Sequence, residues 1–551
     1  MIADIHITEK SFGDKTLMKD VKFSVDDGEK VGVVGRNGVG KSTLFGILSG
    51  KDTDYTGEVI FRRGITIATT AQEHHGLGEQ TVMSYILDGL PEYSKLKKII
   101  DEYPLTMGDN MRKIEEYTQA LERFDQKGFY QVEEKIEREL SNFQLDGYGN
   151  RRISSLSGGQ KRLVEIVKIM HSEAHLALID EPTNHMDYVA KQQFIDWMNS
   201  QPHQAMLIIT HDRDVLGQVD RIVEIKDGQA VSYRGNYDAY LKQNAQATTA
   251  GMNNFEQIEK RIVNLKQKVL DYQRLKEKSR NPGTIQKFKR LENEARAELE
   301  ELSEMEKPTF WIDKESVSQL DYKSAERYGK FKSRNIRLSV KDASSRSQHV
   351  LVRAENVAVG IGERILFEDV NIDLREGEAI EIRGRNGAGK TTLIRMILAS
   401  GKSFDGGPVL YSGDIFLDPQ VRIGVYEQEI DERYLSDPLE KAIEKLYMSR
   451  DLSISDTKIR QLLADYLFTD ADRMTPLARL SGGQKARFQI IAMLANDPQL
   501  LVLDEPTNHL DLPSIEELET ALAKYSGAIL YVSHDNYFRE KLGGKVVQIG
   551  A

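Results

Sequence analysis

The sequence predicts an α/β fold in which two similar domains are joined by an α-helical hairpin. Three observations support this prediction. One series of short motifs occurs twice in the same order, and apolar strand-like runs alternate with helical segments in both copies. The stretch between the copies carries apolar residues at helical spacing. The predicted parts are two domains, residues 1–243 and 348–551, and a linker of residues 244–347.

Length and composition indicate a multidomain protein. The chain has 551 residues, of which 40% are hydrophobic and 29% charged, so it can bury two or more cores. No run reaches about 18 apolar residues, and the start MIADIHITEK lacks the pattern of a secretion signal, so we expect a protein that does not span a membrane. The absence of cysteine excludes disulfides and thiolate metal sites, and fits a cytoplasmic location. The formal charge of −11 means that a polyanionic partner would have to meet a local basic patch.

The repeat comprises four pairs of segments in the same order. The spacing between the second and third segments is identical in the two copies, which indicates one unit copied. Ahead of the second segment the first copy is longer, and its extra residues, in a polar helix-prone stretch, form either a surface embellishment or a second contact device. The pairs are VGVVGRNGVGKST (31–43) and IEIRGRNGAGKTT (380–392), SSLSGGQKRL (154–163) and ARLSGGQKAR (478–487), LALIDEPTNHMD (176–187) and LLVLDEPTNHLD (500–511), and LIITHD (207–212) and LYVSHD (530–535).

The first segment has the pattern GxxxxGK[ST], which predicts a phosphate-binding loop in each copy. Its glycines let backbone N–H groups surround phosphate oxygens at a helix N-terminus. Lys41 and Lys390 would neutralise the β and γ phosphates of ATP, and Ser42 and Thr391 would reach Mg²⁺. One match alone could be a chance glycine turn, but two with the same later motifs are not. The predicted loop residues are Gly35, Asn37, Gly38, Gly40, Lys41, Ser42, Thr43, Gly384, Asn386, Gly387, Gly389, Lys390, Thr391 and Thr392.

The third segment predicts the acidic residues of the reaction. Asp180 and Asp504 end apolar strand-like runs, which places a carboxylate beside the phosphate loop, suited to a metal-bound water. Glu181 and Glu505 follow and are candidates to polarise the attacking water. The alternative is that each acidic pair only caps a strand end in a polar turn.

Two further pairs of residues complete the predicted sites. Gln72 and Gln428 could bridge Mg²⁺ and the attacking water, while His211 and His534 follow another apolar strand and could bind the γ phosphate. A histidine of this kind seen alone would more often be structural. The predicted catalytic residues are Glu181, Glu505, His211, His534, Gln72 and Gln428, and the predicted metal ligands are Ser42, Gln72, Asp180, Thr391, Gln428 and Asp504.

The LSGGQ segment predicts a second anion-binding site in each copy, because a serine hydroxyl and glycine N–H groups open a helix there. Two such sites in one domain cannot both reach the same γ phosphate. We therefore predict that the copies face each other, with each ATP held between the phosphate loop of one copy and the LSGGQ of the other. ATP would join the copies and hydrolysis would separate them. The predicted contact residues are Ser157, Gly158, Gly159, Gln160, Ser481, Gly482, Gly483 and Gln484.

These motifs resemble those of a tandem ATPase of the ABC superfamily, with Walker A, Q-loop, LSGGQ, Walker B, D-loop (Asp187, Asp511) and switch histidine all duplicated. The segments EPTNHMD, EPTNHLD and YRGNYDAYLKQ further resemble the ABC-F branch, which implies two ABC-type P-loop ATPase domains without transmembrane domains, acting on ribosomes. The resemblance also implies that Phe12 stacks on adenine in the first copy. Ile361 holds the equivalent place in the second copy, which puts adenine stacking there in doubt.

The linker predicts an antiparallel helical hairpin. Its two apolar stripes alternate in steps of three and four residues, and SRNPGT supplies a Pro-Gly break between them. We expect arms of about 22 to 26 residues, each ~35 to 39 Å long, with a tip near residues 278–285. The stripes are Phe255, Ile258, Ile262, Leu265, Val269 and Tyr272, then Phe288, Leu291, Ala295, Leu299, Leu302 and Met305.

Positive charge is concentrated at the predicted tip, where Glu277 is the one acidic residue between positions 272 and 290. Such cations repel each other unless a partner supplies negative charge, and a phosphate backbone is the obvious partner. Tyr322, Tyr328 and Phe331 lie among further cations and are expected to stack on RNA. The alternative is a solvated spacer. The predicted RNA-binding residues are Arg274, Lys276, Lys278, Arg280, Lys287, Lys289 and Arg290.

The ABC-F resemblance implies that the linker enters the ribosomal E site towards P-site tRNA and the peptidyl transferase centre, with rRNA and tRNA as partners. We expect a monomer whose two domains form the ATP sandwich. KPTFWIDKES and the basic run after it resemble the linkers of ABC-F proteins that protect ribosomes against antibiotics more than those of the housekeeping members, which favours a resistance factor over a general translation factor. An ATP subunit of a transporter and a DNA-acting ATPase are the alternatives from other classes.

Overall fold

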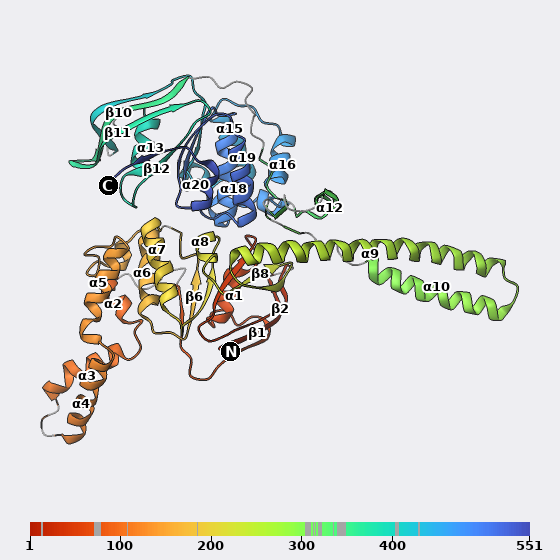
Figure 1. Ribbon diagram of the computed structural model, residues 1–551, viewed down its shortest axis with the longest axis horizontal. Helices are drawn as coiled ribbons and strands as arrows, with labels where there is room; N and C mark the ends of the chain where they lie inside the picture. Colours follow the sequence, from red (N-terminus) through yellow and green to blue (C-terminus); the bar gives the residue numbers. More distant parts are fainter. Residues whose placement is uncertain are drawn as a thin grey trace. The chain divides into compact units, whose positions relative to one another are not determined.

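The structure is a computed structural model (Figure 1), and its residues divide into two compact units. One unit comprises residues 1–237 and 336–551, called here the first domain and the second domain; the other, residues 238–335, is called the hairpin unit. Gln72 and Gln428 lie outside the described residues, and the predicted boundaries at 243 and 348 stay a prediction. The described residues are 1–12, 15–70, 79–106, 108, 110–184, 186–303, 310–311, 313, 316–317, 322–333, 335–338, 349–402, 407–427 and 430–550.

The first domain contains two sheets. The antiparallel sheet has the strand order β2-β1-β4, and the larger sheet has the order β5-β6-β7-β3-β8-β9, in which β8 and β9 pair antiparallel and the other neighbours are parallel. The strands are β1 (Ala3–Phe12), β2 (Lys15–Val25), β3 (Lys30–Gly35), β4 (Thr56–Phe61), β5 (Ile67–Thr69), β6 (Leu176–Asp180), β7 (Ala205–Ile209), β8 (Arg221–Lys226) and β9 (Gln229–Arg234).

The second domain repeats this topology. Its antiparallel sheet has the order β11-β10-β13, and its parallel sheet has the order β14-β15-β16-β12-β17, which matches β5-β6-β7-β3-β8 strand for strand. The predicted α/β class is confirmed. The strands are β10 (Val350–Ile361), β11 (Arg364–Arg375), β12 (Ala379–Arg383), β13 (Pro408–Leu417), β14 (Ile423–Tyr426), β15 (Leu500–Asp504), β16 (Ala528–Val532) and β17 (Lys545–Gln548).

The first domain is longer than the second, and its additional residues include the helices α3 and α4. α3 and α4 lie side by side (Figure 1), joined by a hydrogen bond from Tyr103 to Glu116, and Tyr93 and Phe124 at their base are buried in the domain core. The helices are α1 (Lys41–Leu48), α2 (Val82–Leu87), α3 (Tyr93–Thr106), α4 (Met111–Gln126), α5 (Val132–Asn142), α6 (Gly158–His171), α7 (Tyr188–Ser200) and α8 (Arg213–Leu216), with short 3₁₀ helices η1 (Phe129–Gln131) and η2 (Ile153–Ser155).

Among its described residues, the second domain has no counterpart of the long pair α3 and α4, but it has short additional helices. Its helical core gathers around buried Leu439, Ile443 and Phe488, and is separate from the core between its two sheets. The helices are α13 (Lys390–Leu398), α14 (Glu432–Leu435), α15 (Leu439–Met448), α16 (Asp456–Asp465), α17 (Asp470–Arg473), α18 (Gly482–Leu494), α19 (Leu512–Ala523) and α20 (Asn536–Leu542), with the 3₁₀ helix η3 (Leu477–Arg479).

The apolar strand runs position the functional residues. Every residue of β6 and of β15 is buried, because a central parallel strand is covered by helices on both faces. Asp180 and Asp504 therefore stand at the carboxyl ends of these strands. Beside them, α1 and α13 begin after Gly40 (φ 102°) and Gly389 (φ 96°), a left-handed conformation that glycine adopts without strain.

The hairpin unit is built on α9 (Tyr237–Lys278) and α10 (Pro282–Ser303), with α12 (Tyr322–Phe331) after them. α10 has the expected length, and Pro282 is its first residue, where its missing N–H costs no hydrogen bond. The expected length of the first arm is wrong, because α9 has 42 residues. It begins upstream in the YDAYLKQ segment, and Gly251, where an added Cβ would meet the ring of Phe310, does not interrupt it. Among the described helices, none combines the length and apolar character needed to cross a membrane.

The predicted apolar stripes meet between α9 and α10, which lie side by side in Figure 1. Leu265 and Val269 of α9 pack with Ala295 of α10, and the Tyr272 and Phe288 rings stack with centroids 6.4 Å apart. This confirms the helical pair. The stripe also fixes the register of the two arms.

Two aromatic residues of α12 are buried, which contradicts the expectation that they stack on RNA. Tyr328 and Phe331 are buried with Met252, and Phe255 packs against this cluster, with its ring centroid 5.7 Å from that of Phe331. Burial makes Tyr328 and Phe331 unavailable for stacking on RNA, so that prediction is wrong for them. The side chain of Tyr322 lies outside the described residues.

The hairpin seam leads to a stability prediction. Leu265 is 2% exposed, whereas Val263 on the same helix is 65% exposed. Leu265→Ala should lower the local unfolding free energy of α9 and α10 by about 2–4 kcal/mol, because a buried cavity is left. Amide hydrogen exchange of the two helices measures this change. Val263→Ala is the matched control and should change it by less than about 0.5 kcal/mol; equal effects of the two substitutions would contradict the packing.

Candidate active sites

Each phosphate loop lies against the acidic end of a buried strand in its own domain. The Ser42 hydroxyl donates to Asp180 (3.1 Å), and the Thr391 hydroxyl donates to Asp504 (2.7 Å). The Nζ of Lys41 donates to the Gly35 carbonyl at 2.7 Å. Lys390 makes the same contact with its own loop, at 2.9 Å from the Gly384 carbonyl. Both domains thus bring a lysine, a hydroxyl and a carboxylate together at the start of a helix.

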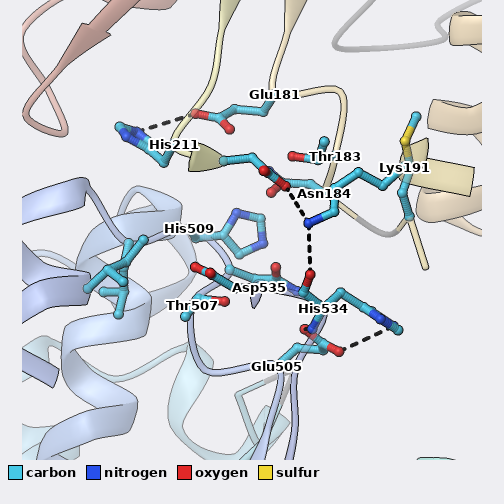
Figure 2. Close-up of a pocket in the computed structure, with 15 residues that line it drawn as sticks. Glu181, Thr183, Asn184, Lys191, His211, Glu505, Thr507, His509, His534 and Asp535 are labelled. Carbon is cyan, nitrogen blue, oxygen red and sulfur yellow. Dashed lines mark hydrogen bonds and ion pairs between the residues drawn. The ribbon is translucent and has the colours of Figure 1, made fainter. Parts of the chain in front are cut away.

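The two glutamates after the strands have an unusual backbone and a histidine neighbour. Glu181 (φ 46°) and Glu505 (φ 51°) are in the left-handed region, which costs non-glycine residues energy and turns the chain sharply at the strand end. His211 Nε2 lies 3.3 Å from Glu181 Oε1, and His534 Nε2 lies 3.4 Å from Glu505 Oε1 (Figure 2). Each predicted histidine therefore contacts the predicted base of its own domain.

Burial changes the protonation of these residues. It raises the pKa of Glu181 to about 8 and that of Glu505 to about 7, although Lys41 and Lys390 oppose the shift. Burial also lowers the pKa of His211 and of His534 to about 3, and the neighbouring lysines add to that shift. Both histidines are consequently neutral near pH 7, so the histidine–glutamate contacts are not ion pairs. The glutamates are poised to exchange a proton near neutral pH.

The LSGGQ residues shape the start of a helix in each domain. Ser157 accepts a hydrogen bond from the Gln160 backbone N–H (3.3 Å), and the Gln160 side chain accepts one from the Ser157 N–H (3.0 Å). Ser481 and Gln484 form the same pair of bonds, at 3.3 and 2.9 Å. These capping boxes fix the beginnings of α6 and α18. The serine and glutamine that were predicted to bind nucleotide thus also hold the helix end.

The phosphate loop of each domain contacts the D-loop of the other. Asp511 Oδ2 accepts from the Asn37 backbone N–H, and Asp187 Oδ2 accepts from the Asn386 backbone N–H, both at 3.1 Å. The other carboxylate oxygen of each aspartate caps its own helix, α19 or α7. Each D-loop aspartate is thus bonded to both domains at once.

A further contact brings the first phosphate loop to the second LSGGQ segment. The Asn37 side-chain amide donates to the His509 carbonyl at 2.9 Å. A Cβ added to Gly483 would overlap the same amide group. Glycine at position 483 is therefore required by this close approach of the two domains.

Three contacts near the sites could not be predicted from the motifs. The Lys191 Nζ donates to the His534 carbonyl (2.9 Å), Arg213 pairs with Glu519 (2.9 Å), and the Asn536 side chain donates to Asp214 (2.7 Å). All three cross between the first and second domains. The one signal in the sequence was a lysine on the otherwise apolar core face of α7, since Ala190, Phe194 and Ile195 around it are buried.

Phe12, the predicted adenine contact, and Ile361, its counterpart in the second copy, lie at equivalent strand ends. Phe12 ends β1 and is 56% exposed, and Ile361 ends β10 and is 54% exposed. The Nζ of Lys10 lies 4.7 Å from the centroid of the Phe12 ring. Stacking of adenine on Phe12 stays a prediction.

The cationic tip is exposed with the exception of Lys276, which is half-buried. Lys276 pairs with Glu292 across the hairpin (2.6 Å), and Arg290 pairs with Glu294 (3.0 Å). Hydrogen bonds from Lys276 and Arg296 lower the pKa of Glu292 to about 2. Two of the predicted RNA-binding cations are thus already neutralised within the hairpin. The other five have no ion-pair partner among the described residues: Arg274, Lys278, Arg280, Lys287 and Lys289.

Comparison with known proteins agrees with these two sites. A family model described as "ABC transporter" matches residues 18–184 and 367–508, one match in each domain. The chain therefore belongs to the ABC ATPases and hydrolyses ATP, with two ATP-binding domains in one polypeptide. Within that class it is a member of the ABC-F family, which confirms the resemblance seen in its motifs.

The relatives cover nearly the whole chain. It is 30% identical to the putative ATP-binding protein YdiF of Bacillus subtilis, over 100% of this chain and 80% of the relative. It is 27% identical to the ribosome protection protein VmlR of Bacillus subtilis, over 96% of this chain and 83% of the relative. It is 28% identical to the energy-dependent translational throttle protein EttA of Mycobacterium tuberculosis, over 97% of this chain and 88% of the relative. Among solved structures, the RNase-L Inhibitor has the same fold (TM-score 0.57, 18% identity, 98% of this chain and 87% of that one).

The pKa shifts predict how hydrolysis depends on pH. A protonated carboxyl group cannot take a proton from water, so kcat/KM for ATP should fall as the pH falls through about 8 and then about 7. Glu181→Gln together with Glu505→Gln should lower kcat by about 10²–10⁴-fold. Steady-state phosphate release between about pH 6 and 9 measures both effects.

The matched control is Glu58→Gln on the exposed strand β4, which should leave rate and pH profile unchanged. A rate that is independent of pH across this window, or hydrolysis that survives in the double variant, would contradict the assigned bases.

Proposed function

We propose that this ABC-F protein binds ribosomes in an ATP-dependent manner and contacts ribosomal RNA and P-site tRNA with the tip of its hairpin. The observation that carries the proposal is the set of five exposed cations at the tip, without ion-pair partners among the described residues, on a protein whose net charge is −11. Five like charges gathered at one apex favour a polyanionic partner. An acidic remainder limits indiscriminate binding to RNA.

The names of two relatives support the same partner. VmlR is named as a ribosome protection protein, and EttA as a translational throttle protein. Both match more than nine-tenths of this chain. We propose that the hairpin enters the ribosomal E site towards the peptidyl transferase centre, in the cytoplasm, and that the protein protects ribosomes against antibiotics.

The proposed chemistry assigns one task to each group of the ATP sites. Ser42 with Asp180, and Thr391 with Asp504, would hold Mg²⁺, because a hydroxyl and a carboxylate are the hard oxygen ligands that it prefers. The ion would supply charge neutralisation at the transferred phosphate. Gln72 and Gln428 remain proposed ligands.

The side chains of the domains would carry out the remaining steps. Lys41 and Lys390 bind the β and γ phosphates, for which they must exchange their present bonds to loop carbonyls. Glu181 and Glu505 orient the attacking water and accept its proton, while His211 and His534 hold these carboxylates in place. Closure on ATP uses the D-loop contacts, and hydrolysis loosens them and lets the ribosome go.

Ribosome cosedimentation tests the partner. With ATP present, the Glu181→Gln, Glu505→Gln protein should pellet with ribosomes, since hydrolysis no longer releases it. Adding Arg280→Glu and Lys287→Glu should weaken this binding and reduce the slope of log affinity against log salt by on the order of 0.7 for each phosphate that the tip no longer neutralises. ATP binding should be unchanged.

The matched control for the charge reversal is Lys260→Glu with Lys266→Glu, two exposed residues further down α9. These changes should leave ribosome binding within about twofold, because they lie outside the cationic tip. If the tip and stem variants lose binding equally, charge at the tip does not direct the contact. Equal loss of ATP binding would indicate misfolding.

The second candidate function is a general translation factor, which the similarity to EttA favours. Growth across a panel of peptidyl-transferase inhibitors separates the two candidates. Cells that express the protein should tolerate at least one inhibitor at a several-fold higher concentration than cells that express the double Glu→Gln variant. No gain for any inhibitor, together with intact ribosome binding, would favour the translation factor.

A further inference from the structure

The contacts between the two domains are not symmetrical around the two active sites. Lys191 on α7 and Ile515 on α19 occupy the same position in the repeat, four residues after the D-loop aspartates. Both line the pocket drawn in Figure 2. The Lys191 Nζ crosses to the His534 carbonyl of the second domain (2.9 Å). Ile515 has no group that could donate a hydrogen bond to the equivalent His211 carbonyl.

Lys191 is held in position from its own domain. It is 4% exposed, and its Nζ lies 2.6 Å from Asp214 and 3.3 Å from Asp212. Burial alone would lower the pKa of Lys191, but these two carboxylates outweigh it and raise the pKa. Because two carboxylates already hold the Lys191 ammonium group in place, its additional hydrogen bond to the His534 carbonyl costs little side-chain conformational entropy.

The residue that accepts this bond is the one that faces the proposed base of the second domain. The His534 backbone N–H donates to Glu505 Oε2 at 3.1 Å, and the His534 ring lies 3.4 Å from Glu505 Oε1. Lys191 therefore fixes the carbonyl of a residue whose N–H and ring both contact Glu505.

We propose that Lys191 is a positioning residue for ATP hydrolysis in the second domain, because its bond to the His534 carbonyl holds His534 against Glu505 only while the two domains are together. The proposal rests on the roles proposed above for Glu505 and His534. With Ile515 in the equivalent place, hydrolysis at Glu181 has no such dependence. The two ATP sites are consequently not equivalent: closure of the domains controls the second-domain site through a bond that the first-domain site lacks.

A second one-sided contact agrees with this difference. Arg213 and Glu519 are both buried and paired at 2.9 Å. The equivalent positions of the repeat hold Asn536 and Ile195, which cannot form an ion pair. The Arg213–Glu519 pair thus has no counterpart at the equivalent positions of the repeat.

The test compares Lys191→Met in two backgrounds. With Glu181→Gln present, hydrolysis depends on Glu505, and Lys191→Met should lower kcat by about tenfold or more with KM changed less than about twofold, as expected for loss of a charged hydrogen bond. With Glu505→Gln present, the same change should lower kcat by less than about twofold. Lys191→Arg should restore most of the rate, since it can still donate.

Rescue and the two kinetic constants distinguish positioning from packing. A side chain that acts by donating to the His534 carbonyl is replaced by Lys191→Arg, which should restore kcat, whereas a loss of packing alone is not restored by it. The control Lys98→Met removes a 70% exposed lysine on α3 and should change neither kcat nor KM.

Three results would overturn the proposal: equal loss of rate in the two backgrounds, no loss with Glu181→Gln present, or a loss that Lys191→Arg does not restore. The last would assign Lys191 to packing alone. The double variant Glu181→Gln, Glu505→Gln, with Lys191 unchanged, tests the role of Glu505 separately. If it still hydrolyses ATP at the rate of the Glu181→Gln variant, the proposed role of Glu505 is wrong.

Discussion

The structure depends on a bond between a carboxylate of one domain and a backbone amide of the other. Asp511 binds the N–H of Asn37, and Asp187 binds the N–H of Asn386, while each aspartate also caps the helix behind it. The amide lies in the phosphate loop, so the contact that joins the domains is made by the segment that would surround ATP. The contact between the domains and the predicted phosphate-binding loops therefore use the same stretch of backbone.

Burial is the second constraint, and it has opposite effects on acids and bases. The same dry surroundings raise the pKa of Glu181 and Glu505 and lower that of His211 and His534. Both partners of each pair are thus brought close to neutrality, which avoids isolated buried charge. The neighbouring lysines of the phosphate loops oppose the shift of the glutamates and keep their ionisation within reach near neutral pH.

Much of this arrangement could be predicted because it is encoded locally. Gly40 and Gly389 permit the left-handed turn before each helix, and the apolar runs that end at Asp180 and Asp504 favour buried strands, so short segments indicate the two copies of the fold. The features that were missed depend on partners distant in the sequence. The burial of Tyr328 is decided by Met252, and the environment of Lys191 by the carbonyl of His534. Periodicity gives the face of a helix, but not which residue of another element covers it.

The unbroken course of α9 has a mechanical consequence. Its 42 residues form a rod of about 60 Å with no proline inside it. The hydrogen-bonded backbone resists bending along this length, and the seam with α10 braces the half that carries the cations. In a rod of this length, the distance that the far end travels for a given change of axis direction grows in proportion to the number of residues in the helix.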